Sequence, residues 1–307
     1  MTVWHKPVLA GAVVEWLKIR PDGTYVDATV GTGGHALEIA RRLTTGRLVG
    51  LDRDERALAA ARERLGEYER RVTLVQANFS GIEDVARELG LPPVDGLVAD
   101  LGVSTLQLDT ADRGFSFRHR APLDMRMDRS AALTAEEIVN EWRERELADL
   151  LFHLGEERDA RRIARAIVRA RPIRDTEHLA TVVAGARKAK GRQKLHPATK
   201  TFLALRIAVN REMEELEQFL LRAPATLALG ARWVILSYHS LEDRRVKQAF
   251  RSLASTGEMR VLTKKPIVPT FEEIDENPRA RSARMRVVEK IGAAGPQEQE
   301  RWSNSIQ

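Results

Sequence analysis

The stretch TYVDATVGTGGHALEIA, residues 24–40, decides the fold because it joins a strand, a tight turn and a helix. Its first part is β-branched and apolar, its middle is the glycine-rich run Gly31-Thr-Gly-Gly34, and its last part has helical spacing. Glycines at this place let the backbone turn sharply and approach a ligand closely. The stretch therefore predicts a strand–turn–helix unit with a ligand site at the turn.

The same alternation continues on the C-terminal side of this stretch. Strands are predicted at 47–52, 72–77 and 94–101, and helices lie between them at 54–65 and 82–89. Continuous apolar strands separated by helices indicate a parallel sheet that is covered on both faces. Between residues 103 and 197 the alternation stops and only helices are predicted, at 134–142, 144–154, 157–171 and 176–188. The first of them is opened by the capping box Thr134-Ala-Glu-Glu137.

Alternation of helices and strands resumes near residue 198. The elements expected there are a long helix at 198–221, a strand at 232–238, a helix at 240–253 capped by Ser240 with Asp243 in the box position, and final strands at 260–263 and 282–290. The predicted fold is thus an α/β sheet interrupted by an all-helical insertion. We place the core at 1–108 and 197–291, the insertion at 109–196, and a disordered polar tail at 292–307.

Composition excludes several classes of protein. The 307 residues are 43% hydrophobic and 31% charged and contain no cysteine, which excludes disulfides, cysteine–zinc sites and thiol catalysis. No run of about 18 apolar residues and no signal-peptide pattern occurs, so we expect a cytoplasmic protein without a membrane span. No two histidines are spaced i, i+4, and we expect no catalytic metal.

Charge is concentrated in one region. The chain carries a net charge of +6, but residues 158–211 hold 15 Lys and Arg against 3 Asp and Glu. Such asymmetry predicts contact with a polyanion, and the alternative is a solvated helix face. The cationic loop after residue 186 supplies the predicted RNA-binding residues Arg187, Lys188, Lys190, Arg192 and Lys194.

Acidic and aromatic residues follow the predicted parallel strands. Asp52 ends the second strand, 19 residues after Gly33, where a carboxylate can accept both ribose hydroxyls. Phe79 follows the third strand, where it can lie against an adenine, and Asp100 ends the fourth. Glycines and strand-end acids fit both a nicotinamide dinucleotide, through Gly31-x-Gly33-x-x-Ala36, and S-adenosylmethionine.

Three features favour S-adenosylmethionine. Asp27 lies in the first strand just before the loop, no second βαβ half follows, and the paired final strands suit the hairpin of a methyltransferase sheet. An NAD(P)-dependent oxidoreductase and a non-catalytic RNA-binding protein stay open as alternatives at this point. No Tyr-x-x-x-Lys occurs to serve the former.

Many longer segments resemble one family. They are HKPVL (5–9), DATVGTGGH (27–35), DRD (52–54), DLGVS (100–104), QLD (107–109), RGFSF (113–117), PLDMRMD (122–128), GEER (155–158), RIARAI (162–167), HPAT (196–199), SYHSLED (237–243) and ENPRAR (276–281). Together they resemble the RsmH (MraW) family of bacterial methyltransferases that act on the exocyclic N4 of a cytidine in small-subunit (16S) ribosomal RNA. The resemblance implies a class I (Rossmann-like) methyltransferase sheet with an inserted helical substrate-recognition domain.

The resemblance also implies site residues and partners. It places donor contacts at Gly33, Gly34, His35, Asp52, Phe79, Asp100 and Gln107. It further implies assembled or nearly assembled small subunits as the substrate, and a homodimer is left open. The sequence departs from the family pattern at Ser104-Thr-Leu and at Tyr238, where Phe is frequent.

The chemistry of an amino nitrogen sets the search for catalytic residues. The lone pair of cytosine N4 is delocalised into the ring, so a hydrogen-bond acceptor and a base are needed. Asp100 is the first candidate, followed by Asp109 and Asp124, and His119 or His239 could also act. The target base must leave its stack, and the aromatic residues expected to support it are Trp4, Phe115 and Phe117.

Overall fold

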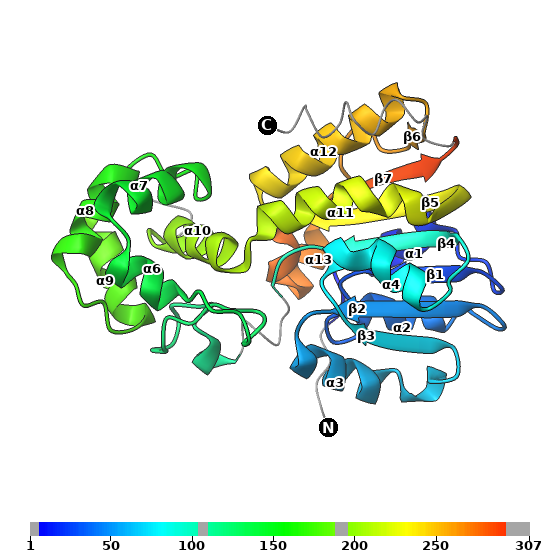
Figure 1. Cartoon of the computed structure of the whole chain (residues 1–307), viewed down its shortest axis with the longest axis horizontal. Coiled ribbons are helices and arrows are strands. Elements are labelled where there is room, and N and C mark those ends of the chain that lie inside the picture. Colours follow the sequence, from blue (N-terminus) through cyan, green and yellow to red (C-terminus); the bar gives the residue numbers. More distant parts are fainter. Residues whose placement is uncertain (1–5, 104–109, 188–195, 293–307) are drawn as a thin grey trace. The chain divides into compact units, whose positions relative to one another are not determined.

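The computed structural model describes residues 6–103, 110–187 and 196–292 (Figure 1). Contacts between Cα atoms divide the chain into two compact units. Unit 1 comprises Met1–Gly102 and Met213–Gln307, and unit 2 comprises Val103–Glu212. Within the described ranges, every helix is too short or too polar to cross a bilayer. The tail predicted to be disordered lies outside these ranges from residue 293 onward.

Unit 1 is built on one seven-stranded sheet in the order β3-β2-β1-β4-β5-β7-β6. The strands are β1 (Thr24–Asp27), β2 (Arg47–Asp52), β3 (Val72–Gln76), β4 (Val94–Asp100), β5 (Leu227–Ser237), β6 (Met259–Val261) and β7 (Arg284–Lys290). The first five are parallel, whereas β7 runs antiparallel to both β5 and β6. The predicted parallel sheet with an antiparallel final pair is therefore confirmed.

Helices cover both faces of this sheet (Figure 1). They are α1 (Ala10–Leu17), α2 (Gly34–Ala40), α3 (Glu55–Arg64), α4 (Ile82–Glu88), α11 (Glu212–Thr226), α12 (Ser240–Ser255) and α13 (Phe271–Glu276). Residues of α1, α2 and α3 form one buried cluster with alternate strand residues such as Val98 and Val234. Trp233, which directly precedes Val234 in β5, faces the opposite side of the sheet. It packs edge-on against Phe219 of α11 and Phe250 of α12.

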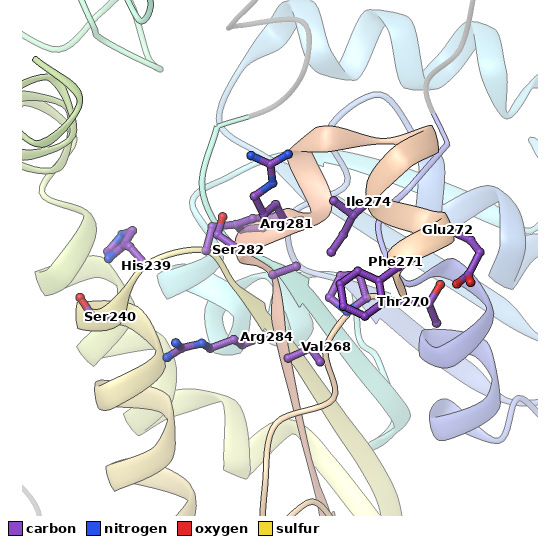
Figure 2. Close-up of a pocket in the computed structure, with 13 residues that line it drawn as sticks. His239, Ser240, Val268, Thr270, Phe271, Glu272, Ile274, Arg281, Ser282 and Arg284 are labelled. Atoms are coloured by element: carbon purple, nitrogen blue, oxygen red, sulfur yellow. The ribbon is translucent and has the colours of Figure 1, made fainter. Parts of the chain in front are cut away.

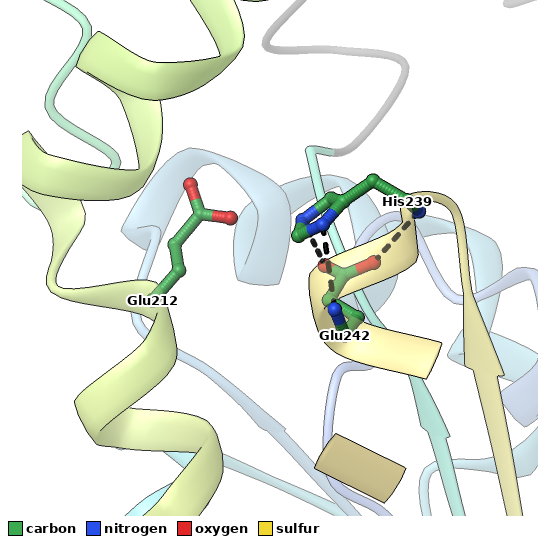
Figure 3. A group of neighbouring side chains, drawn as sticks. All are labelled: Glu212, His239 and Glu242. Carbon is green, nitrogen blue, oxygen red and sulfur yellow. Dashed lines mark hydrogen bonds and ion pairs between the residues drawn. The ribbon is translucent and has the colours of Figure 1, made fainter. Parts of the chain in front are cut away.

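The cap of α12 differs from the predicted one. The N-cap is His239, whose ring accepts from the backbone N–H of Glu242, while the Glu242 carboxylate accepts from the backbone N–H of His239 (Figure 3). Ser240 is the first helical residue. Asp243 does not cap the helix, because its two oxygens bind the guanidinium groups of Arg284 and Arg286.

Unit 2 is helical in its regular structure. Its helices are α6 (Ala135–Glu141), α7 (Glu144–His153), α8 (Ala160–Arg169), α9 (Thr176–Ala186) and α10 (Thr199–Asn210). The predicted cap is confirmed, because the Thr134 side chain accepts from the backbone N–H of Glu137. Apolar residues at helical spacing on each helix, such as Ile163 and Ile167 of α8, form a separate core.

The second boundary between the units lies later than predicted. The expected helix 198–221 is two helices, because Arg211 takes a left-handed conformation with φ 50° between α10 and α11. Helix α10 belongs to unit 2, since Phe202 and Leu205 lie in the helical core. The Asn210 side chain also accepts from the N–H of Met127 and donates to the carbonyl of Met125. The insertion therefore spans 103–212 instead of 109–196.

Candidate active site

Three carboxylates lie at the carboxyl ends of neighbouring parallel strands. Asp27 ends β1, Asp52 ends β2 and Asp100 ends β4, and β1 pairs with both of the other strands. In an open parallel sheet the carboxyl ends share one edge, which is where ligands bind. The structure therefore brings these predicted site residues together within unit 1.

The glycine loop is tied to Asp52. Gly31 and Gly33 have positive φ values of 52° and 82°, which a residue with a side chain rarely adopts. Asp52 Oδ2 accepts from the N–H of Gly31 at 2.9 Å, and Oδ1 accepts from the N–H of Asp54 at 2.8 Å. A carboxylate offers about four lone-pair sites, so Asp52 keeps acceptor capacity for two ribose hydroxyls. Burial raises the pKa of Asp52 to about 6, and these two backbone bonds oppose the shift.

The Asp100 carboxylate is held from both sides. Its Oδ1 accepts a 2.7 Å hydrogen bond from the hydroxyl of Tyr238, and its Oδ2 lies 3.5 Å from His35 Nε2. The backbone N–H of Asp100 donates to Thr29 Oγ1 at 2.6 Å, which fixes the end of β4 to the segment after β1. A carboxylate with a hydrogen bond at one oxygen and a histidine ring beside the other has a defined direction, as positioning of a reacting atom requires.

A buried histidine and a buried acid stand behind Asp100. His35 is 5% exposed and Asp27 is 1% exposed. Burial lowers the pKa of His35, but the hydrogen bond and charge of Asp100 outweigh it, so the net shift is upward. Burial raises the pKa of Asp27 to about 7. Asp27 Oδ2 and both ring nitrogens of His35 have no hydrogen-bond partner in the described part of the chain, so these two side chains retain polar capacity toward a ligand.

Tyr238 is fixed by its own neighbours. Its backbone N–H donates to Glu242 Oε2 at 2.8 Å. Burial and the charges of Asp100, Glu242 and Glu273 raise the pKa of Tyr238 well above its ordinary value. The phenol therefore stays protonated and acts as a donor to Asp100.

Phe79 and the glycine loop complete the predicted donor residues in unit 1. Phe79 follows β3 at the start of a 3-10 helix, Phe79–Gly81, and is half-buried. Its ring meets the edge of Phe219 at a centroid distance of 5.2 Å. Gly34 is the first residue of α2, directly after the loop. Gln107, the remaining predicted donor contact, lies outside the described residues.

The other catalytic candidates have different surroundings. Asp124 belongs to unit 2, and its two oxygens bind Arg126 at 2.7 and 3.1 Å. Burial opposes ionisation of Asp124, but the bonds and charge of Arg126 prevail and lower its pKa. This arrangement favours a structural role. Asp109 lies outside the described residues, and His239 serves as the cap of α12.

Some of the residues predicted to contact RNA or to support the target base lie in unit 2, and the others lie outside the described residues. Arg187 is engaged inside unit 2, where Nη2 lies 3.6 Å from the buried Glu157 and Nη1 donates to the Pro197 carbonyl. Lys188, Lys190, Arg192 and Lys194 lie outside the described residues, as does Trp4. Phe115 is buried in the unit 2 core, and Phe117 stacks on His196 at 4.5 Å and packs against that core.

Sequence reasoning missed the bond from Tyr238 to Asp100. The segment SYHSLED was noted as a motif, but 137 residues separate the two positions and their contact follows from the pairing of β4 with β5. In that pairing Asp100 is opposite Leu236, two residues before Tyr238. The departure from Phe at this position was the available signal, because a hydroxyl placed among buried residues needs a partner.

Comparison with known proteins identifies the family. The sequence profile described as the MraW methylase family matches residues 2–291. A protein of Cyanothece sp. named "Ribosomal RNA small subunit methyltransferase H" is 52% identical over 289 residues, covering 94% of this chain and 95% of that protein. Proteins of the same name from Solibacter usitatus and Koribacter versatilis are 50% and 49% identical, and the alignments cover 99% and 92% of their lengths.

These matches extend over nearly the whole chain. They include the glycine loop, the three strand-end carboxylates and the helical unit 2 in one continuous alignment range. The chain belongs to the MraW methylase family.

Proposed function

We propose that this chain transfers a methyl group from S-adenosylmethionine to the exocyclic N4 of a cytidine in the 16S RNA of the small ribosomal subunit. The observation that carries the proposal is the position of Asp100. Its carboxylate accepts from Tyr238 at one oxygen, has His35 beside the other, and stands at the same sheet edge as Asp52, which keeps free acceptor sites.

The residues present fit the methyl donor. Asp52 would accept from the ribose hydroxyls, Phe79 would lie against the adenine, and the backbone of Gly33 and Gly34 would approach the donor closely. Asp27 Oδ2 and both ring nitrogens of His35 are buried polar atoms without a hydrogen-bond partner among the described residues. When bound, S-adenosylmethionine supplies a methyl group already activated by its sulfonium.

Asp100 would act on the acceptor. Its carboxylate can accept from the N4 amino group, which localises the nitrogen lone pair, and it can take the proton that leaves during transfer. Tyr238 and His35 hold the two oxygens in place during this step. The raised pKa of His35 keeps its ring cationic beside Asp100 over a wider pH range.

A basic face on unit 2 would contact the RNA backbone. Exposed arginines at 158, 161, 162, 165 and 169 repeat at helical spacing along α8 and its N-terminal flank, while Ile163 and Ile167 face the core. Only Arg165 makes an ion pair with a residue in the described ranges, at 3.3 Å from Glu144. Like charges at i, i+4 destabilise an isolated helix by about 0.2–0.5 kcal/mol per pair. A polyanion such as RNA would neutralise this face.

Two finer points belong to the same proposal. Assembled or nearly assembled small subunits, instead of free RNA, are the proposed substrate, as the family resemblance implies. The homodimer and the cytoplasmic location remain predictions from the sequence.

The proposed activity is tested by incubating the protein with labelled S-adenosylmethionine and small subunits from a strain that lacks the modification. We expect label on a single cytidine of 16S RNA, at N4, as mapped by nuclease digestion and mass spectrometry. Free 16S RNA, tested in parallel, should be labelled more slowly. Label on another nucleoside or another atom would contradict the proposed reaction, and equal labelling of free RNA would contradict the choice of substrate.

A further inference from the structure

A cavity of about 680 Å³ lies in unit 1 beside the candidate active site (Figure 2). Three segments line it: the junction of β5 and α12, the helix α13 with the residues before it, and the segment that leads into β7. This volume is in the range of sites that bind small molecules and cofactors. The established family activity does not assign a ligand to these residues.

The cavity has an apolar surface that faces solvent. Phe271 is 85% exposed and Val268 is 58% exposed, although both are large hydrophobic side chains. Both line the cavity, as Figure 2 shows. Singly exposed apolar residues are ordinary, but an exposed aromatic ring inside a polar-rimmed cavity indicates a partner that stacks on it.

A cationic group stands at the rim. Arg281 is exposed and makes no ion pair with any residue in the described ranges, whereas Arg284 is bound to Asp243 at 3.1 Å. Glu272 lies on the opposite side of Phe271 from Arg281 (Figure 2). An exposed aromatic ring and an available guanidinium that line the same cavity suit a nucleotide, since the base can stack and the phosphate can bind.

Tyr238 connects the cavity to the reacting carboxylate. It lines the cavity, and its hydroxyl donates to Asp100 Oδ1 at 2.7 Å. Tyr238 is therefore shared by the wall of the cavity and the surroundings of Asp100. The occupant of the cavity would sit next to the base that is methylated, not in its place.

We infer that this cavity binds a nucleotide adjacent to the target cytidine in the RNA, with its base stacked on Phe271 and its phosphate against Arg281. The inference rests on the proposed function. It makes the cavity a subsite that selects the sequence or shape around the target.

The test compares Phe271→Ala and Phe271→Trp with the wild type on modification-free small subunits. Base–aromatic stacking is worth about 1–3 kcal/mol per base, so kcat/KM for subunits should fall roughly 5- to 150-fold in Phe271→Ala. Phe271→Trp should retain most activity, because it keeps a stacking face. The affinity for S-adenosylmethionine, measured by calorimetry, should stay unchanged in both variants.

A matched control is Leu229→Ala. Leu229 is 73% exposed and lies near the start of β5, at the opposite end of that strand from Tyr238. The Leu229→Ala variant should leave kcat/KM for subunits unchanged. For the cationic part of the site, Arg281→Gln should raise KM for subunits, and Arg251→Gln, an exposed arginine of α12, should not.

Ultraviolet crosslinking identifies the occupant. The peptide that contains Phe271 should carry a nucleotide next to the methylated cytidine. A crosslink to the target cytidine itself, a crosslink to a distant nucleotide, or unchanged kcat/KM in Phe271→Ala would overturn the inference. Failure of the proposed function would give a different result, because the wild-type protein itself would leave the N4 of 16S cytidines unmethylated.

Discussion

The hydroxyl of Tyr238 donates a 2.7 Å hydrogen bond to Oδ1 of Asp100, so the segment after β5 fixes the direction of the carboxylate at the end of β4. The other oxygen of Asp100 lies 3.5 Å from His35 at the start of α2. Three segments of the chain thus converge on one acidic group, and each contact can be removed separately.

Removing the Tyr238 hydroxyl should slow methyl transfer. In Tyr238→Phe the ring keeps its packing, but Asp100 loses a hydrogen bond of the charge-assisted type, worth about 1.5–3 kcal/mol. We expect kcat to fall roughly tenfold or more, with little change in donor affinity. Steady-state kinetics on small subunits measure kcat, and calorimetry with S-adenosylmethionine measures the donor affinity.

The control for this change is Tyr25→Phe. The Tyr25 hydroxyl accepts from the backbone N–H of Arg20, near the start of β1 and away from the carboxyl ends of the strands. It should lower stability without changing kcat once the protein is folded. If Tyr238→Phe retains wild-type kcat, the bond does not position Asp100.

Replacing Asp100 should separate catalysis from donor binding. In Asp100→Asn the side chain keeps its shape, but an amide cannot carry away a proton and accepts weakly from the N4 amino group. General-base catalysis contributes about 10²–10⁴-fold, so kcat should fall by at least about a hundredfold. Donor affinity should fall far less. Equal losses of kcat and donor affinity would make Asp100 a donor-binding residue.

Donor affinity should depend on pH through Asp52. Its pKa is raised to about 6 by burial, and the ionised form is the better acceptor for ribose hydroxyls. We expect constant affinity above about pH 7 and a fall of up to about tenfold per pH unit below pH 6. Calorimetric titrations of S-adenosylmethionine between pH 5 and 8 provide the measurement.

Asp52→Asn should bind the donor weakly and without this pH dependence. Glu67→Gln, an exposed residue of unit 1, serves as the control and should keep the wild-type profile. A pH profile that is unchanged in Asp52→Asn would assign the titration to another group.

The buried Asp27 should make the protein less stable as the pH rises. Its folded pKa of about 7 lies above the ordinary value of about 3.9, so the folded state binds more protons than the unfolded state between these values. The contribution of Asp27 to the free energy of unfolding is therefore fully present below about pH 4. It is lost as the pH rises from about 4 to about 7. The full effect is of the order of 4 kcal/mol.

Asp27→Asn removes this titration and keeps an oxygen for the N–H of Thr29, which Asp27 Oδ1 accepts at 3.2 Å. The variant should gain stability relative to wild type at pH 8 and show no such gain near pH 4.5, as measured by urea unfolding. Asp22→Asn, at an exposed turn, should show no such difference. A gain that is equal at both pH values would show that ionisation of Asp27 is not responsible.

The arginine face of α8 should set the salt dependence of RNA binding. Each phosphate contact to single-stranded RNA contributes about −0.7 to the slope of log K against log salt. If Arg161, Arg162 and Arg169 each contact a phosphate, changing all three to Gln should make the slope shallower by about 2. Glutamine is a comparable helix former, so α8 should persist.

The matched control changes three exposed arginines of unit 1, Arg62, Arg70 and Arg251, to Gln and so removes the same net charge. Its slope should stay near that of the wild type. A companion variant changes Arg187, Lys188, Lys190, Arg192 and Lys194 to Ser. If only this loop variant flattens the slope, the RNA contact lies in the loop and the α8 arginines form a solvated face.

The order of strands and helices could be predicted because it depends on local sequence. The β-branched run before Gly31, the glycines at positive φ and the apolar strand 94–101 each specify their own element, whatever surrounds them. Asp52 and Asp100 were placed at one sheet edge from the sequence, since the carboxyl ends of parallel strands coincide.

Other features depend on contacts between distant segments, and only the tertiary structure decided them. The end of α10 at Arg211 has no Gly or Pro to mark it and follows from packing of Phe202 and Asn210 in unit 2. The partner of the Tyr238 hydroxyl follows from the pairing of β4 with β5. The exposure of the Phe271 side chain likewise becomes visible only in the folded chain. The sequence alone predicted which residues could carry the chemistry, because residue type and strand position are local. Their hydrogen bonds, burial and pKa shifts needed the fold, because those properties depend on neighbours that are far apart along the chain.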